Sequence, residues 1–230
     1  MNNRHAVSYS IVRSRRRTVA IHIKKDATVE VRAPLFTSRM AIDTFVAAKE
    51  KWIIEHMDKY ERRNAARSAF TLNYGDMLTL RGGTYPVRAS EDGRAGFDGD
   101  SFLVPPNLPS ASVKAAVIGA YKDIAKCVLT EKTAYYAEQL CVIPAAVKIS
   151  NAKMRWGSCS GKNIINYSWL LIMADDSAID YVVVHELAHI REPNHSARFW
   201  GVVEGVLPDY NRSRKRLKGL QDKLFLEDWG

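Results

Sequence analysis

The chain has 230 residues, 47% of them apolar and 26% charged, which is ordinary for a globular protein and argues against disorder. It lacks both a run of about 20 apolar residues and the apolar core of a signal peptide, so we expect a soluble, cytoplasmic protein with no membrane partner. Of the net charge of +9, residues 1–67 carry +8, from 15 Lys and Arg against seven Asp and Glu. This basic region either attracts nucleic acid, a nucleotide or an acidic surface, or is a solvated face.

The N-terminal third is predicted to form a small sheet with a helix on it. Residues 18–24 and 28–34 alternate apolar and polar side chains around a short turn, which predicts a hairpin. A further short strand is expected near residues 7–12. Apolar residues at helical spacing then predict one amphipathic helix over residues 39–63, capped by Ser38.

The middle and C-terminal parts predict a second region. Residues 68–106 are rich in Gly and Asp between short apolar runs, which indicates small hairpins. Further along, we expect a helix over residues 112–140 and strands over residues 145–150 and 163–171. The fold class is therefore α+β, with a basic β-rich region with one long helix over residues 1–106 and a metal-binding catalytic domain with a small mixed sheet over residues 107–230.

The C-terminal part is predicted to be helical. A helix should begin near Ser177, which forms an imperfect capping box with Asp180. It carries "AIDYVVVHELAHI". A further helix runs through "SARFWGVVEGVL", and a basic amphipathic helix through "YNRSRKRLKGLQDKLF" completes the chain.

His185, Glu186 and His189 spell H-E-x-x-H within the apolar helix. Residues four apart lie on one helical face, so both imidazoles can reach one ion, and Zn²⁺ suits such a ligand set. Glu186 is then placed to deprotonate a zinc-bound water as general base. Burying these polar groups among valines and leucines without a metal would destabilise the fold by roughly several kcal/mol for each uncompensated charge.

The third ligand is expected downstream of the helix. His195 follows His189 by five residues, and Pro193 should end the helix and turn the chain back toward the metal. The spacing is that of the metzincins, but Glu192 replaces their glycine and no Met follows Met173, so the Met-turn is absent. Glu204 is the rival third ligand, by analogy with glutamate-ligated zincins.

The segments "RWGSCS" and "DYVVVHELAHIREPNHSARFW" resemble the YgjP-like metallopeptidase domain family, as do "SRRRTVAIHIKKDATVEVRAP" and "FVAAKEKWI" nearer the N-terminus. The resemblance covers nearly the whole chain. It implies a zincin-like fold distantly similar to SprT-type and WLM-type metalloproteases. It also implies zinc on His185, His189 and His195, with Glu186 as the catalytic base and a peptide or protein as the substrate.

The segment 155–160 has two interpretations. In one, Gly157 allows a close backbone approach and Arg155 stabilises a developing oxyanion; in the other, the segment is a tight turn with Trp156 and Cys159 packed inside. The following strand should edge the cleft, with Asn166 or Tyr167 facing the substrate. Three cysteines without a C-x-x-C pair argue against a disulfide framework or a cysteine zinc site.

Three functions are compatible with these features. The first is a zinc peptidase, and the second is a metal-dependent nucleoside triphosphate pyrophosphatase whose basic N-terminal region binds phosphate. The third is a nucleic-acid-associated protein, either with structural zinc or as a SprT-like protease acting on DNA-bound proteins. Structural zinc usually has four protein ligands, and a fourth is hard to find here.

Overall fold

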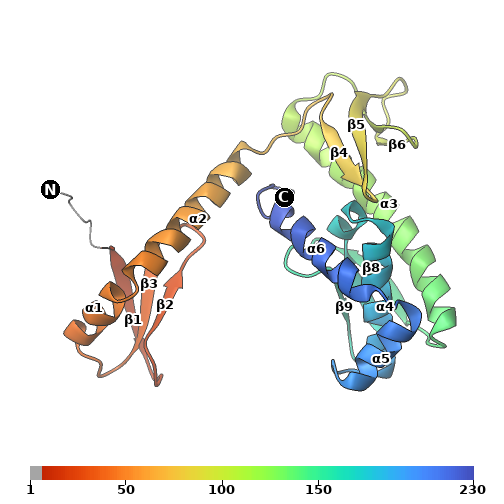
Figure 1. The fold of residues 1–230 in the computed structure, drawn as a ribbon. Helices are drawn as coiled ribbons and strands as arrows, with labels where there is room; N and C mark the ends of the chain where they lie inside the picture. The colour runs from red at the N-terminus through yellow and green to blue at the C-terminus, as the bar shows by residue number, and fades with distance from the viewer. Residues whose placement is uncertain (1–6) are drawn as a thin grey trace. The chain divides into compact units, whose positions relative to one another are not determined.

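The computed structural model describes residues 7–230, which divide into two compact units (Figure 1). The first unit extends to Phe70 and includes Phe225–Asp228; the second comprises Thr71–Leu224 and Trp229–Gly230. Residues 71–106, which the sequence analysis grouped with the N-terminal region, therefore pack with the residues that follow them.

The first unit contains a three-stranded sheet in the order β1-β3-β2. Its strands are β1 (Tyr9–Ser14), β2 (Ala20–Ile23) and β3 (Val29–Pro34). The predicted hairpin is confirmed, because β2 and β3 pair antiparallel, while β1 pairs parallel with β3. Alternation along β3 turns Val29, Val31 and Ala33 into the core.

Two helices cover this sheet, α1 (Arg39–Ala47) and α2 (Glu50–Ala69), with Ser38 capping α1 as predicted. The single helix expected over 39–63 is wrong, because the backbone departs from helical geometry at Lys49 (φ −113°, ψ 6°). The break lets apolar residues of both helices pack on one core: Ile42, Val46 and Ile53.

The second unit begins with a four-stranded sheet in the order β4-β5-β7-β6. The strands are β4 (Met77–Leu80), β5 (Gly83–Ala89), β6 (Gly96–Phe97) and β7 (Phe102–Val104). The sheet packs on the long helix α3 (Ser110–Gln139), where Phe102 lies with its ring centroid 4.7 Å from that of Tyr121.

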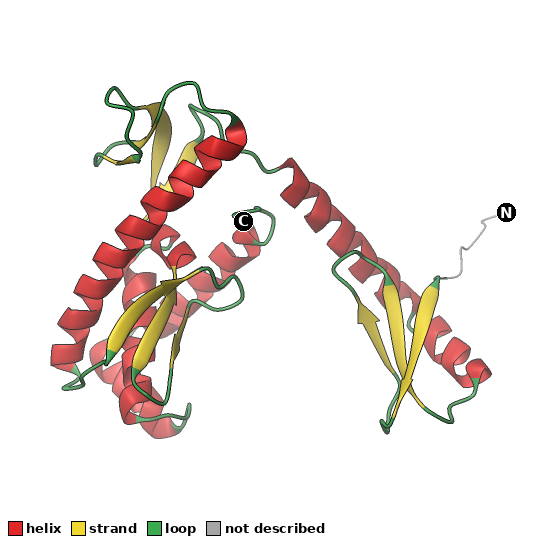
Figure 2. Ribbon diagram, turned by 180° about the vertical axis from the view of Figure 1, so that it is seen from behind, coloured by secondary structure: helices red, strands yellow, loops and turns green. Residues whose placement is uncertain are grey.

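A second three-stranded sheet follows, in the order β8-β10-β9 (Figure 2). Its strands are β8 (Ala146–Ser150), β9 (Gly157–Cys159) and β10 (Ile164–Ser168). The strand expected over 163–171 ends at Ser168, whose hydroxyl accepts from the N–H of Leu170 and starts the 3-10 helix η1 (Trp169–Met173). The apolar run "WLLIM" is therefore a buried helical turn rather than strand.

Three helices complete the unit: α4 (Asp176–Arg191), α5 (Ala197–Val206) and α6 (Tyr210–Leu224). Helix α4 packs against α3, α5, α6 and β9, so its apolar residues are buried on several sides. Its cap is Asp175 and not Ser177, because the Asp175 carboxylate accepts from the N–H of Ala178, and the Ser177 hydroxyl donates to that carboxylate.

The predicted α+β fold class is confirmed, since separate small mixed sheets pack on helices in both units. Among the described residues, no helix combines the length and the apolar character needed to cross a membrane.

Candidate metal centre

Helix α4 ends where the sequence predicted a turn. Glu192 is extended (φ −130°, ψ 96°) while its N–H still bonds to the Ala188 carbonyl, and Pro193 then prevents further helix. Ser196 caps α5 by accepting from the N–H of Phe199. His195 is thus held in a short turn between a helix end and a helix cap.

The turn brings His195 against the two histidines of α4. The Nε2 atoms of His195 and His185 lie 3.1 Å apart. One ligand nitrogen from each of His185, His189 and His195 lies within 4.8 Å of the other two. The three imidazoles predicted from sequence therefore converge on one point.

A shell of aromatic side chains positions these imidazoles. The fully buried ring of Phe199 lies beneath all three, with centroid distances of 4.6 to 4.9 Å. The Tyr181 hydroxyl lies 3.3 Å from Nδ1 of His185, which leaves Nε2 of that ring to face the other histidines. Such partners orient metal-ligating histidines in proteins.

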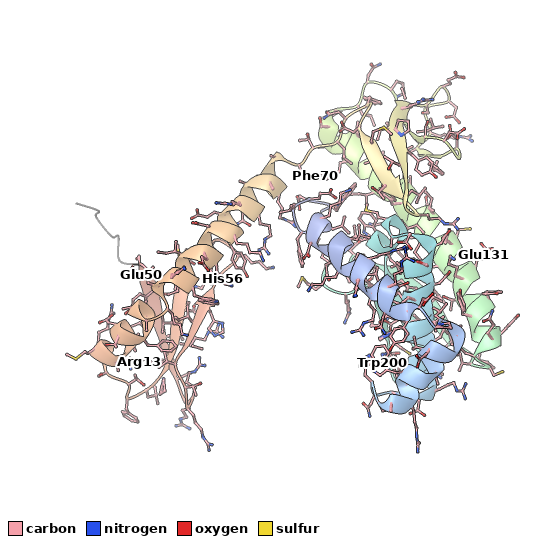
Figure 3. The ribbon with its side chains drawn as sticks, viewed as in Figure 1. Arg13, Glu50, His56, Phe70, Glu131 and Trp200 are labelled. Carbon is pink, nitrogen blue, oxygen red and sulfur yellow. The ribbon has the colours of Figure 1, made fainter. Side chains whose placement is uncertain are left out.

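A second set of aromatic rings extends from His195, and the sequence analysis did not predict that these rings stack on one another. Trp200 on α5, labelled in Figure 3, stacks on His195 at 5.7 Å and on Tyr210 at 5.3 Å. Tyr210 stacks in turn on Tyr181. The guanidinium of Arg214 lies 5.0 Å from the centre of the Trp200 ring. In the sequence, the sign of this set is the adjacent aromatic pair Phe199 and Trp200, about one helical turn after His195.

His185 and His189 are held in their neutral form. The pKa of His185 is lowered to about 3, mainly by burial and also by the charges of His189, His195 and Arg214. Burial and His195 likewise lower the pKa of His189. Neutral imidazoles expose nitrogen lone pairs, so this donor set fits a divalent cation and disfavours protonation.

Glu186 is almost fully buried beside the histidines. Burial raises the pKa of its carboxyl to about 7, against the opposing effects of the Arg155 charge and a hydrogen bond from the backbone N–H of Cys159. A Cβ on Gly157 would lie 2.7 Å from Oε1 of Glu186. Gly157 thus allows the close backbone approach that was one of the two interpretations of this segment.

Strand β9 forms the sheet edge above this carboxylate. The sequence analysis placed the following strand, β10, at the edge; this is wrong, because β10 lies between β8 and β9. Trp156 accepts from the N–H of Ser168, and the N–H of Ser160 donates to Ile164. By the alternation of an antiparallel pair, the main-chain groups of Gly157 and Cys159 point away from β10, toward the free edge.

The other predicted site residues are more dispersed. Arg155 is exposed just before β9, and its charge acts on Glu186. Tyr167 is fully buried with its hydroxyl 3.1 Å from that of Thr133, so it faces the core and has no surface for a substrate. Asn166 is half-buried on the opposite face of β10. Glu204, the rival ligand, is exposed and lies outside the histidine cluster.

Cys159 is half-buried with its side chain on the face of β9 nearest Glu186. Burial and the Glu186 charge raise the pKa of its thiol. The thiol is therefore held protonated, which makes it a poor nucleophile. Its contribution to the site is the backbone N–H that bonds to Glu186.

One solved structure with a related sequence is the metallopeptidase zymogen of Pyrococcus abyssi abylysin, which is 25% identical over 42% of this chain and 90% of that chain, with a TM-score of 0.34. Comparison with curated proteins found no match. The family model of the YgjP-like metallopeptidase domain matches residues 17–220. That range covers most of each unit and every residue of the candidate site, and the chain therefore belongs to the YgjP-like metallopeptidase domain family.

Proposed function

We propose that the chain is a zinc-dependent peptidase in which His185, His189 and His195 bind the ion and Glu186 is the general base. The observation that carries this proposal is the convergence of three imidazoles beside a buried carboxylate, beneath the free edge of a strand. Catalytic zinc sites commonly have three protein ligands and one open position.

The histidine cluster fits zinc in both donor type and spacing. Zinc–nitrogen bonds are about 2.0–2.1 Å long, so three imidazole nitrogens around one ion lie a little over 3 Å apart, roughly the spacing of His185 and His195. Bound there, zinc would supply the positive charge that polarises a carbonyl and acidifies a water molecule.

Glu186 would move the protons of the hydrolysis. Its carboxyl accepts a proton from the attacking water and returns it to the leaving amine nitrogen. A pKa of about 7 suits both transfers, because the group gains and loses a proton with little cost near neutral pH. The Cys159 N–H and the space left by Gly157 hold the carboxylate in one position.

The free edge of β9 would bind the substrate as an extended strand. The outward main-chain groups of Gly157 and the carbonyl of Cys159 are placed to pair with a peptide beside Glu186, while the Cys159 N–H stays with the carboxylate. Arg155 lies at the start of this edge and supplies a positive charge for the oxyanion that develops at the scissile carbonyl.

The test compares Glu186→Gln with the wild-type chain on casein. We expect kcat to fall about 10²- to 10⁴-fold, because the amide cannot accept the proton. Zinc measured by mass spectrometry should stay at one ion per chain, because the three imidazoles are unchanged. Glu204→Gln is the matched control and should retain both activity and zinc.

The same preparations should be incubated with nucleoside triphosphates. Pyrophosphate release without casein cleavage would replace the peptidase proposal with the phosphoanhydride hydrolase considered above. Full casein cleavage by the Glu186→Gln chain would overturn the proposed role of the carboxylate.

A further inference from the structure

The N-terminal unit has a strand edge of its own, on β2. The N–H of Lys24 donates to the Thr28 carbonyl at 2.8 Å, which fixes the alternation of the β2–β3 pair. The main-chain N–H and C=O groups of Ile21 and Ile23 therefore point away from β3. Among residues 7–230, none hydrogen-bonds to these groups. They form a free hydrogen-bonding edge.

A recess lies beside this edge. It has a volume of about 210 Å³ and is lined by Ile21, Phe45, Lys49 and Trp52. Ile21 contributes to both features, since its side chain lines the recess and its main chain lies on the free edge. The break between α1 and α2 falls at Lys49, so the recess is a product of the interrupted helix.

Trp52 is unusually exposed for a large aromatic side chain, at 42%. Its ring is supported from one side by His56, whose ring centroid is 4.2 Å away; Figure 3 labels His56 on α2. A supported but exposed indole next to an apolar recess is typical of the anchor positions at protein interfaces.

The net positive charge of this unit favours an acidic partner. Residues 7–70 and 225–228 hold 14 Lys and Arg against nine Asp and Glu, a net charge of +5. Glu30 already pairs with Lys24 and Arg32. Lys49, by contrast, has no ion pair within the part of the chain that the structure describes. A basic surface with an available lysine at the recess favours an acidic segment.

We propose that the edge of β2 and the recess at Trp52 form a docking site for an extended acidic segment of the protein substrate. The segment adds a strand to β2 through Ile21 and Ile23, places an apolar side chain in the recess and a carboxylate near Lys49. This site would add substrate docking to the proposed peptidase function. The identification of the bound segment as part of a substrate rests on that proposed function.

The features favour a peptide over a nucleic acid. Outward N–H and C=O groups on alternate residues match the main chain of another strand, whereas nucleic acid offers no such ladder. Single-stranded nucleic acid would need several stacking rings and a cationic groove along the backbone. The recess contains one exposed indole and one lysine.

The experiment measures binding to the full-length Glu186→Gln chain, so that cleavage does not interfere and the result does not depend on peptidase activity. The probe is a fluorescein-labelled peptide in which glutamate alternates with valine around one central phenylalanine, followed by fluorescence polarisation. Trp52→Ala should weaken binding about tenfold or more, as expected for an interface anchor. Lys49→Glu should weaken it as well, by charge repulsion.

Matched controls are available on the same helix. Ile54→Ala removes a side chain that is 44% exposed and does not line the recess, and Lys51→Glu makes the same charge change two residues away. Both should bind within about twofold of the parent, on the usual scale of near-neutral contacts. Circular dichroism melting confirms that each variant remains folded.

A peptide N-methylated at alternate residues tests the strand pairing, because it cannot form the ladder and should bind poorly. The proposal is overturned if the unmodified peptide does not bind when the chain is in 100-fold excess over it. It is also overturned if the N-methylated peptide binds equally well, or if Trp52→Ala and Ile54→Ala change peptide binding to the same extent. Tighter binding and displacement by an oligothymidine would assign the surface to nucleic acid instead.

Discussion

The sheet of the N-terminal unit and the sheet beside α4 have the same strand arrangement. In each, a middle strand pairs parallel with one neighbour and antiparallel with the other, in the orders β1-β3-β2 and β8-β10-β9. In each, the antiparallel strand is short and lies at an edge. The two edges differ in what lies against them.

The edge of β9 faces a buried carboxylate, and the edge of β2 flanks a recess that contains an exposed tryptophan. One outward group of β9, the Cys159 N–H, is used by Glu186, while those of Ile21 and Ile23 have no partner among the described residues. The comparison teaches that strand order alone does not decide function. The two edges differ in their surroundings: at β9, Gly157 of the strand makes room for Glu186 of α4, and at β2 the recess lies at the break between α1 and α2.

The largest effect is expected from removing the third imidazole, which would break the feature that distinguishes the two edges. His195→Ala should lower zinc affinity at least about 100-fold, beyond the loss typical of outer-shell changes. Competition with a chromogenic chelator measures this affinity. Tyr181→Phe, which removes only the hydroxyl near His185, should cost about tenfold. Equal affinities for His195→Ala and the wild type would remove His195 from the ligand set.

The next effect concerns Gly157, whose missing Cβ makes room for Glu186. Gly157→Ala should lower kcat about tenfold to 100-fold by displacing the carboxylate, with zinc content unchanged. Gly161→Ala is the matched control, because a Cβ there meets nothing within 4 Å. If both alanines had the same kcat, Gly157 would have no role in positioning Glu186.

A smaller effect is expected in amide hydrogen exchange, which measures the exchange rates of amides along both β2 and β9 in one experiment. On β2, the amides of Ile21 and Ile23 should exchange about tenfold or more faster than that of His22, whose N–H faces β3. On β9, Gly157 should exchange faster than Cys159, because Glu186 accepts from the Cys159 N–H. Uniform protection along β2 would contradict a free edge.

The parts of the site that could be read from the sequence depend on local geometry. Helical periodicity places His185 and His189 on one face, and Pro193 ends the helix so that His195 can return. Their convergence follows from these short-range constraints, while zinc binding by them stays a prediction.

The remaining features depend on contacts between distant segments. Alternation put Tyr167 on one side of β10 but could not tell whether that side was the core. A strand as short as β9 has no periodicity to detect, so its place at the edge was missed. The α1–α2 break at Lys49 was also missed, because the apolar spacing of residues 39–63 continues through it.

The smallest predicted effect concerns how α4, the helix that faces β9, is held at its start. Arg81 in the β4–β5 turn donates twice to Asp176 at 2.8 Å, and Lys132 lies 3.7 Å from the same carboxylate. Burial acts to raise the pKa of Asp176, but the hydrogen bonds and charges of Arg81 and Lys132 outweigh it and lower the pKa. A depressed pKa means that the carboxylate stabilises the folded state above its unfolded pKa of about 4.

That stabilisation should disappear as pH falls through the lower folded pKa. Asp176→Asn should therefore reduce the free energy of unfolding by up to about 1 kcal/mol at pH 7, since the pair is nearly half exposed, and by less at pH 3. Urea unfolding at the two pH values measures the difference. The control is Asp92→Asn, whose carboxylate lies 3.8 Å from Arg94 in a highly exposed pair and should have no measurable effect. A loss at pH 3 as large as at pH 7 would mean that the carboxylate charge does not hold the start of α4.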